Sequence, residues 1–76
     1  MTPTYREIAD AITARIAAGE WPPGARLPTT ETFAADYEVS EATAYRALSL
    51  LIDRRTIRGE QGRARFVPGD ETPSDA

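Results

Sequence analysis

Residues 27–51 read LPTTETFAADYEVSEATAYRALSLL, and this stretch decides the fold. Apolar residues recur at spacings of three and four on both sides of a break at residues 37–40. The pattern predicts two short amphipathic helices that are joined by a tight turn. That arrangement is a helix-turn-helix, a motif whose second helix enters the major groove of DNA.

The first helix of this pair is expected to begin at Thr29 or Thr30, because either hydroxyl can accept a hydrogen bond from a free N–H group of the first turn. The helix is only about two turns long. Its inward residues are expected to be Phe33, Ala34 and Tyr37.

Ser40 is expected to cap the second helix, with Val39 as the buried residue of the turn. The small side chains of Ala44 and Ala47 allow another helix to cross closely. The predicted inward stripe consists of Ala44, Ala47, Leu48 and Leu51. The residues predicted to point outward are Glu41, Ala42, Tyr45 and Arg46.

A further helix is expected upstream of this pair. Thr2 can cap it, and Pro3 fits its first position, where a missing N–H donor costs nothing. Gly19 can end it in a left-handed conformation, and Gly24 suits a turn that follows two prolines. Residues 25–27 are expected to form a short extended segment. The apolar stripe of this helix consists of Tyr5, Ile8, Ala9, Ile12 and Ile16.

Two β-prone runs follow the helix pair. Residues 56–58 and 64–67 are expected to form a hairpin around a loop of residues 59–63. The predicted fold is therefore mainly α with a small β-hairpin, a winged helix-turn-helix of three helices and a two- to three-stranded wing. The domain is expected to span residues 1–69. Residues 70–76 are too polar and small to pack, so a disordered acidic tail is expected there.

Composition narrows the chemistry that is available. The 76 residues suffice for one small domain that buries about 60% of its unfolded surface. Cysteine and histidine are both absent, which removes disulfides, thiolate nucleophiles, zinc sites of the usual kind and imidazole catalysis. No enzyme, cofactor or metal site is predicted. Because the chain has no apolar leader and no membrane-spanning run, we expect a cytoplasmic protein. The large apolar residues expected to complete the core are Trp21, Leu27, Phe33, Ile57 and Phe66.

Charge is distributed unevenly along the chain, whose net charge is −3. Residues 27–51 carry four acids against a single cation, Arg46. Residues 47–69 carry five arginines and two acids, so positive charge gathers after the helix pair. Because DNA is a polyanion, the acidic balance of the helix pair is the main argument against DNA binding.

The following residues occur in order and with near-gapless spacing: Tyr5, Ile8, Ala9, Ile12, Ile16, Gly19, Pro23, Gly24, Leu27, Pro28, Thr29, Phe33, Ala34, Val39, Ser40, Thr43, Arg46, Ala47, Leu48, Leu51, Ile57, Gly62, Phe66 and Val67. Over about residues 3–68, this series resembles the winged helix-turn-helix of the GntR family. The resemblance implies a bacterial or phage-type transcription regulator that binds double-stranded DNA. In that family the third helix enters the major groove, the wing touches the adjacent minor groove, and two copies usually sit on a palindromic operator.

GntR regulators normally carry a C-terminal domain that binds an effector and dimerises. Here seven polar residues follow the wing, so the chain is either a stand-alone DNA-binding domain or a fragment of a longer protein. A homodimer is expected at least on DNA.

The resemblance also implies that the start of the third helix contacts DNA. Ser40 and Thr43 lie where hydroxyls and free N–H groups can hold a phosphate, although capping alone also accounts for Ser40. Tyr45 has no reason in the core to point outward, and it can donate to a phosphate or lie against a thymine methyl group. Arg46 can bind phosphate or guanine, and the alternative is an intramolecular ion pair with Glu31 or another acid.

Three positions depart from the family pattern. The family often has arginine or threonine at the positions of Glu41 and Ala42, and a DNA-contacting arginine at that of Glu31. Glu41 can accept a hydrogen bond from a cytosine amino group, or it can orient Arg46 or Tyr45. The third alternative is that this helix does not read DNA in the usual way.

The wing supplies the remaining predicted contacts. Gly62 lets the loop approach a DNA backbone closely, and Arg63 at the tip suits a narrow minor groove. A solvated surface cluster is the alternative for the wing arginines. The predicted DNA-binding residues are Thr29, Ser40, Glu41, Ala42, Thr43, Tyr45, Arg46, Gln61, Gly62, Arg63 and Arg65.

Two functional hypotheses follow. The first is a sequence-specific transcription regulator, a repressor that occludes a promoter as a dimer on a palindromic operator. The second is a winged-helix interaction module, or a DNA mimic, that uses its acidic helix face to engage a basic partner.

Overall fold

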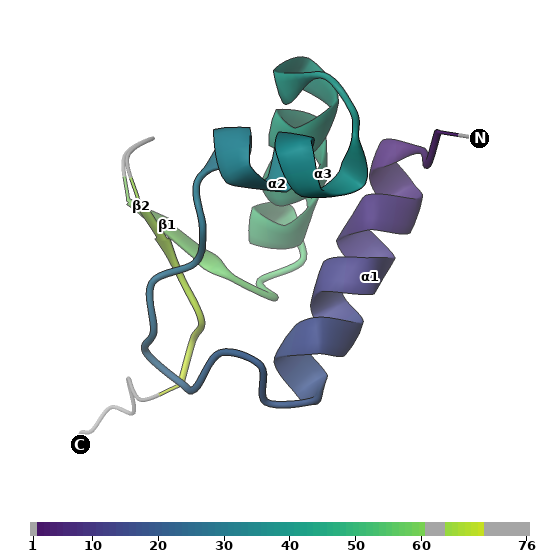
Figure 1. The fold of residues 1–76 in the computed structure, drawn as a ribbon. Helices are drawn as coiled ribbons and strands as arrows, with labels where there is room; N and C mark the ends of the chain where they lie inside the picture. The colour runs from purple at the N-terminus through teal and green to yellow at the C-terminus, as the bar shows by residue number, and fades with distance from the viewer. Residues whose placement is uncertain (1, 61–63, 70–76) are drawn as a thin grey trace.

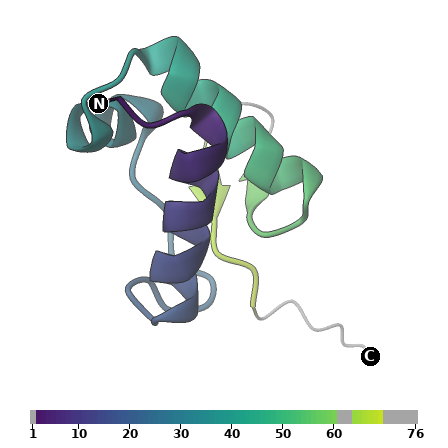
Figure 2. The same ribbon diagram turned by 90° about the vertical axis from the view of Figure 1, so that its right-hand side faces the viewer.

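The computed structural model describes residues 2–60 and 64–69 of the chain (Figure 1). It contains the helices α1 (Tyr5–Ala17), α2 (Thr30–Tyr37) and α3 (Glu41–Asp53) and the strands β1 (Arg58–Glu60) and β2 (Ala64–Phe66). In Figure 1, α1 lies on one side of α2 and α3 and the hairpin lies on the other. Figure 2 looks onto α1, with the hairpin behind it. The prediction of three helices followed by a hairpin is confirmed.

The start of α1 corrects the sequence-based expectation. Thr4, not Thr2, is the N-cap, so the prediction that the helix begins at Pro3 is wrong. The Thr4 hydroxyl oxygen accepts from the Glu7 N–H at 3.1 Å, and the Glu7 carboxylate accepts from the Thr4 N–H at 2.9 Å. This reciprocal capping box satisfies two donors at once and requires an acid three residues after the cap, which Thr2 lacks. The predicted left-handed conformation of Gly19 is confirmed, at a φ of 84°.

The turn between α2 and α3 is fixed by local hydrogen bonds. Thr29 rather than Thr30 caps α2, and Ser40 caps α3 as predicted. Glu38 ends α2 in a left-handed conformation at a φ of 58°, which is uncommon for a residue other than glycine. Val39 is only half-buried, although it packs against the core. The turn therefore depends more on backbone geometry than on a fully buried plug.

The core lies between α1, α2 and α3, and the predicted inward stripe of α3 is fully buried. Ala44 and Ala47 are 1% and 0% exposed, and α1 packs against α3. Phe33 is completely buried and lies 6.0 Å from the Trp21 ring in an edge-to-face arrangement. Trp21 and Phe66 are only half-buried, so their assignment to the core holds in part.

The hairpin is antiparallel and pairs Arg58 with Phe66 and Glu60 with Ala64. Its first strand begins at Arg58, so the prediction of a strand over residues 56–58 is wrong at its first two positions. The N–H groups of Thr56 and Ile57 donate instead to the Leu51 carbonyl, at 2.9 and 3.4 Å. These bonds satisfy a carbonyl at the end of α3 and keep both residues out of the sheet.

The extended segment predicted for residues 25–27 is confirmed, and it pairs with the wing as a third extended segment. Arg26 forms an antiparallel bridge with Phe66, and the Leu27 N–H donates to the Arg65 carbonyl at 2.8 Å. The Val67 N–H donates to the Ala25 carbonyl at 2.9 Å. As a result, β2 lies between β1 and the segment that leads into α2.

The predicted loop tip and tail, residues 61–63 and 70–76, lie outside the described residues. None of the helices in the described ranges is long and apolar enough to cross a membrane.

Candidate nucleic-acid interface

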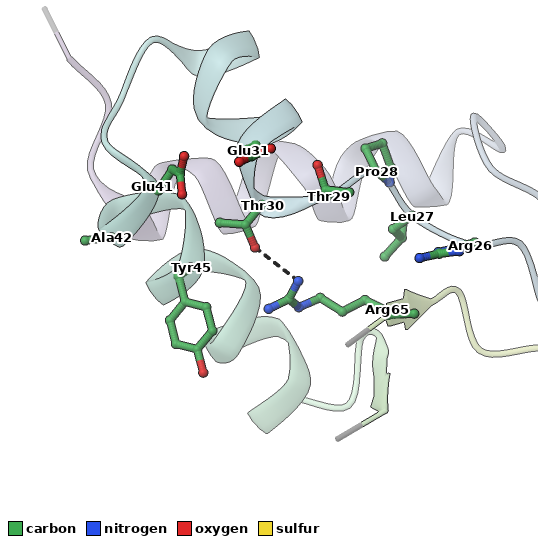
Figure 3. Close-up of a pocket in the computed structure, with 11 residues that line it drawn as sticks. Arg26, Leu27, Pro28, Thr29, Thr30, Glu31, Glu41, Ala42, Tyr45 and Arg65 are labelled. Atoms are coloured by element: carbon green, nitrogen blue, oxygen red, sulfur yellow. Dashed lines mark hydrogen bonds between the residues drawn. The ribbon is translucent and has the colours of Figure 1, made fainter. Parts of the chain in front are cut away.

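A groove of about 520 Å³ opens where the start of α2, the start of α3 and strand β2 meet (Figure 3). Residues 26–28, before α2, and residues 29–31, at its start, line the groove, and α3 contributes Glu41, Ala42 and Tyr45. Strand β2 contributes Ala64 and Arg65. Segments that are about 40 residues apart in the sequence therefore share one surface.

Two helices begin beside this groove, and both use the same capping arrangement. The Thr29 hydroxyl oxygen accepts from the Thr32 N–H at 3.2 Å, and the Ser40 hydroxyl oxygen accepts from the Thr43 N–H at 3.1 Å. The Ser40 hydroxyl also donates to the Thr43 hydroxyl oxygen at 3.1 Å. Because helix N-termini carry partial positive charge and free N–H groups, both helix starts favour an anion such as phosphate.

Tyr45 is the one large apolar side chain, among the described residues, that is strongly exposed, at 54%. Figure 3 shows its ring projecting from α3 over the groove. Glu41 and Ala42, one turn earlier on α3, are exposed on the same wall. The residues predicted to point outward from α3 therefore do so.

Arg65 reaches from β2 into the groove rather than toward open solvent. Its Nη1 donates to the Thr30 hydroxyl oxygen at 3.1 Å, and its guanidinium carbon lies 5.6 Å from the centre of the Tyr45 ring. Figure 3 shows the side chain extending from β2 toward these two residues. Arg65 therefore connects the wing to both helices of the helix-turn-helix.

Arg46 lies on the opposite flank of α3, next to α1. Its guanidinium carbon is 4.2 Å from the centre of the Tyr5 ring, and that of Arg6 is 5.6 Å from the same ring. The alternative expectation, an ion pair between Arg46 and Glu31, does not occur in the described part of the chain. Arg46 and Arg6 are both exposed, so this flank is cationic.

Two of the four acids of the helix pair share a groove with cations in the folded chain. Glu31 and Glu41 line the groove together with Arg26 and Arg65. Arg26 is not among the residues predicted from the sequence to bind DNA. Its position could have been predicted from the extended segment at residues 25–27, because pairing of that segment with the wing brings Arg26 to the same surface.

Three predicted residues, Gln61, Gly62 and Arg63, lie outside the described ranges. Arg54, which follows α3, has its Nη1 atom 3.5 Å from an Asp10 carboxylate oxygen on α1, away from the groove.

The resolved pKa shifts belong to a cluster at the other end of α1. Arg15 donates to both carboxylate oxygens of Glu20, at 2.9 and 2.7 Å, and to the Tyr37 hydroxyl at 3.0 Å. These hydrogen bonds raise the pKa of Arg15, and the hydrogen bond from Arg15 lowers the pKa of Glu20. The Arg15 guanidinium also lies 4.7 Å from the centre of the Trp21 ring. The cluster ties α1 to α2 and does not contribute to the groove.

Three helices, a hairpin that pairs with the segment before α2, and a groove at two helix starts define a winged helix-turn-helix. A family model described as bacterial regulatory proteins, gntR family, matches residues 4–67. The chain therefore belongs to the gntR family and carries its winged helix-turn-helix DNA-binding domain. The family and the fold are those of transcription regulators, not of enzymes.

Individual relatives support this assignment. The chain is 36% identical over 73 residues to the mannosyl-D-glycerate transport/metabolism system repressor MngR of Escherichia coli K12, a match that covers 96% of this chain and 30% of MngR. The chain spans less than a third of the length of the curated relatives it matches.

Solved structures show the same fold. A GntR family transcriptional regulator from Listeria monocytogenes superposes with a TM-score of 0.80 at 26% identity, covering 90% of this chain and 60% of that one. Streptococcus agalactiae BusR, in complex with its busAB promoter DNA, superposes with a TM-score of 0.78 at 31% identity. That match covers 93% of this chain and 35% of BusR.

Proposed function

We propose that this chain is the operator-reading domain of a repressor that binds a palindromic site as a dimer and occludes a promoter. The observation that carries the proposal is the groove at the starts of α2 and α3, into which Tyr45 projects. MngR is described as a repressor, and BusR was solved on promoter DNA. The first resemblance favours repression, and the second favours DNA binding.

In this mechanism α3 lies in the major groove and reads base edges with Glu41, Ala42, Tyr45 and Arg46. Glu41 accepts a hydrogen bond from a cytosine amino group, which favours a G·C pair at that position. The Tyr45 ring lies against a thymine methyl group, or its hydroxyl donates to a neighbouring phosphate. The methyl group of Ala42 leaves room for a base to approach closely.

Phosphates are held on both sides of the reading residues. The hydroxyls and N–H groups of Thr29, Ser40 and Thr43 bind the backbone at the helix starts. Arg26, from the strand side, neutralises phosphates and supplies part of the affinity that depends on salt. Repression is then steric, because a bound dimer covers the promoter.

The acidic-face alternative, a module that binds a basic partner or mimics DNA, is less favoured because two of the four acids behind it line a groove with arginines. Glu31 and Glu41 share their groove with Arg26 and Arg65, so the surface does not present an uninterrupted acidic patch.

The proposal can be tested on DNA selected by the chain itself. A random duplex pool is enriched with the 76-residue protein, and affinities for the selected duplex and for a scrambled duplex of equal composition are measured at about 50 mM salt. Tyr45→Ala and Arg46→Ala are each expected to lower the preference for the selected duplex about tenfold. Asp36→Ala, an exposed change on α2 outside the groove, is the matched control. A wild-type protein with no preference for any duplex would exclude operator reading.

A further inference from the structure

We infer that Arg65 is a positioning residue for DNA reading, which holds Tyr45 in its reading orientation and thereby couples the wing to α3. The inference rests on the proposed function and assigns a role within the same site. It also differs from the sequence-based expectation, in which Arg65 belongs to the wing residues that contact DNA directly.

The backbone of Arg65 is fixed from both sides. Within the hairpin it pairs with Gly59 of β1, and its carbonyl accepts from the Leu27 N–H at 2.8 Å. Strand β2 pairs with β1 on one side and with the extended segment at residues 25–27 on the other. The Arg65 backbone is therefore held more firmly than that of a residue on an outer strand. The Arg65 side chain can therefore act as a rigid arm from the wing toward the helices.

The far end of that arm is also fixed. One guanidinium nitrogen donates to the Thr30 hydroxyl oxygen at 3.1 Å, while the guanidinium carbon lies 5.6 Å from the Tyr45 ring centre. A planar guanidinium can donate through its edge and lie near an aromatic ring at the same time, whereas the ammonium group of lysine cannot reproduce this geometry.

The consequence for Tyr45 is preorganisation. An exposed tyrosine on a helix surface samples several rotamers, and ordering such a side chain on binding costs free energy. The guanidinium beside the ring restricts those rotamers before DNA arrives. Loss of Arg65 should therefore weaken the recognition of bases that Tyr45 touches, without removing a phosphate contact.

The charges around Arg65 also argue against a role as a phosphate contact. Its side chain is half-buried in a groove that Glu31 and Glu41 line, so these acids offset its charge locally. Arg26 lines the same groove but is exposed, and within residues 2–60 and 64–69 its guanidinium makes no hydrogen bond or ion pair. Arg26 is therefore the matched control for a cation that is available to phosphate.

The experiment is a double-substitution cycle on the 76-residue chain, read out on the selected and scrambled duplexes across a salt series. Arg65→Ala is expected to lower the preference for the selected duplex about tenfold, close to the effect of Tyr45→Ala. The double variant should lose no more than either single variant. The slope of log affinity against log salt should stay unchanged for Arg65→Ala and fall by about one for Arg26→Ala.

Two milder variants protect the test against loss of folding. Arg65→Lys keeps the charge and should still lose preference, and Thr30→Val removes the hydroxyl acceptor at similar shape and should show a smaller loss. Thermal unfolding of each variant confirms that it is folded. Additive effects of Arg65→Ala and Tyr45→Ala, full rescue by lysine, or a reduced salt slope for Arg65→Ala would each overturn the inference while leaving the proposed function intact. Equal affinity of the wild type for both duplexes would overturn both.

Discussion

The groove has two walls of different origin. The helical wall, at the starts of α2 and α3, carries hydroxyls, the acids Glu31 and Glu41, and Tyr45. The strand wall, formed by the segment before α2 and by β2, carries Arg26 and Arg65. The first wall supplies shape and hydrogen-bonding groups, and the second supplies positive charge.

This difference shows how an acidic helix-turn-helix can still face a polyanion. The helical wall is ordered by contacts between residues three or four apart, together with one buried core. The strand wall is ordered by backbone pairing across more than 35 residues, as in the bridge between Arg26 and Phe66. Specificity and affinity are therefore expected to respond to substitutions in different elements.

The largest expected effect is a loss of stability in the core beneath the helical wall. Phe33→Ala should lower the free energy of unfolding by about 3–5 kcal/mol, because Phe33 is fully buried and packs against Trp21 and Tyr37. Urea denaturation measures the change, and Phe33→Leu offers a milder variant that retains a folded baseline. Tyr45→Ala, on the exposed face of the same wall, should shift stability by less than about 0.5 kcal/mol. Similar losses for Phe33→Ala and Tyr45→Ala would contradict the assignment of Phe33 to the core.

A second pair of variants tests whether Ser40 contacts DNA in addition to capping its helix. Ser40→Ala and Thr4→Ala each remove an N-cap hydroxyl and should each cost about 1 kcal/mol of stability. Only Ser40 lies at the start of α3, so only Ser40→Ala should also weaken DNA binding at a temperature where both variants are folded. Equal DNA affinity for the two variants would show that Ser40 acts as a cap alone.

The strand wall is tested by Arg26→Ala. Because this exposed arginine lies opposite the helix starts, its loss should weaken binding to selected and scrambled DNA by the same severalfold factor. Unfolding should change little. Anisotropy titrations measure the ratio of variant to wild-type affinity on each duplex. A loss confined to the selected duplex would instead make Arg26 a base-reading residue.

The smallest effect concerns a contact outside the groove. The pKa of Glu20 is lowered in the folded chain by its hydrogen bonds from Arg15, so its contribution to stability is present above the unfolded pKa. That contribution is lost as pH falls below about 4.5 and through the lower folded pKa. Glu20→Gln should therefore reduce stability slightly at neutral pH, and the difference from the wild type should shrink under acid conditions. DNA affinity at neutral pH should be unchanged, which ordinary titrations can check.

Most of the helical part of the fold could be predicted from the sequence, because its determinants are local. The stripe of α3, the Ser40 cap and the left-handed Gly19 follow from spacings of a few residues and from backbone preferences. The one misplaced helix start had a local cause as well. Thr2 and Thr4 are both good caps, and the choice between them depends on the acid at Glu7, three residues after Thr4.

The strand wall was harder to predict. Thr56 and Ile57 have strand-prone side chains, yet their N–H groups bind the carbonyl at the end of α3. Their local preference was overridden by a hydrogen bond that closes a helix. For the same reason, β1 is short and begins only at Arg58.

By itself, the sequence determined the three helices, their inward faces and the outward position of Tyr45, because helical periodicity and capping act over three or four residues. Only the tertiary structure decided which charges meet. Arg26 and Arg65 come from segments far apart in the chain, and backbone pairing places both in the groove that Glu31 and Glu41 also line. The acidic helix pair of the sequence thus becomes, in the folded chain, one wall of a groove whose other wall is cationic.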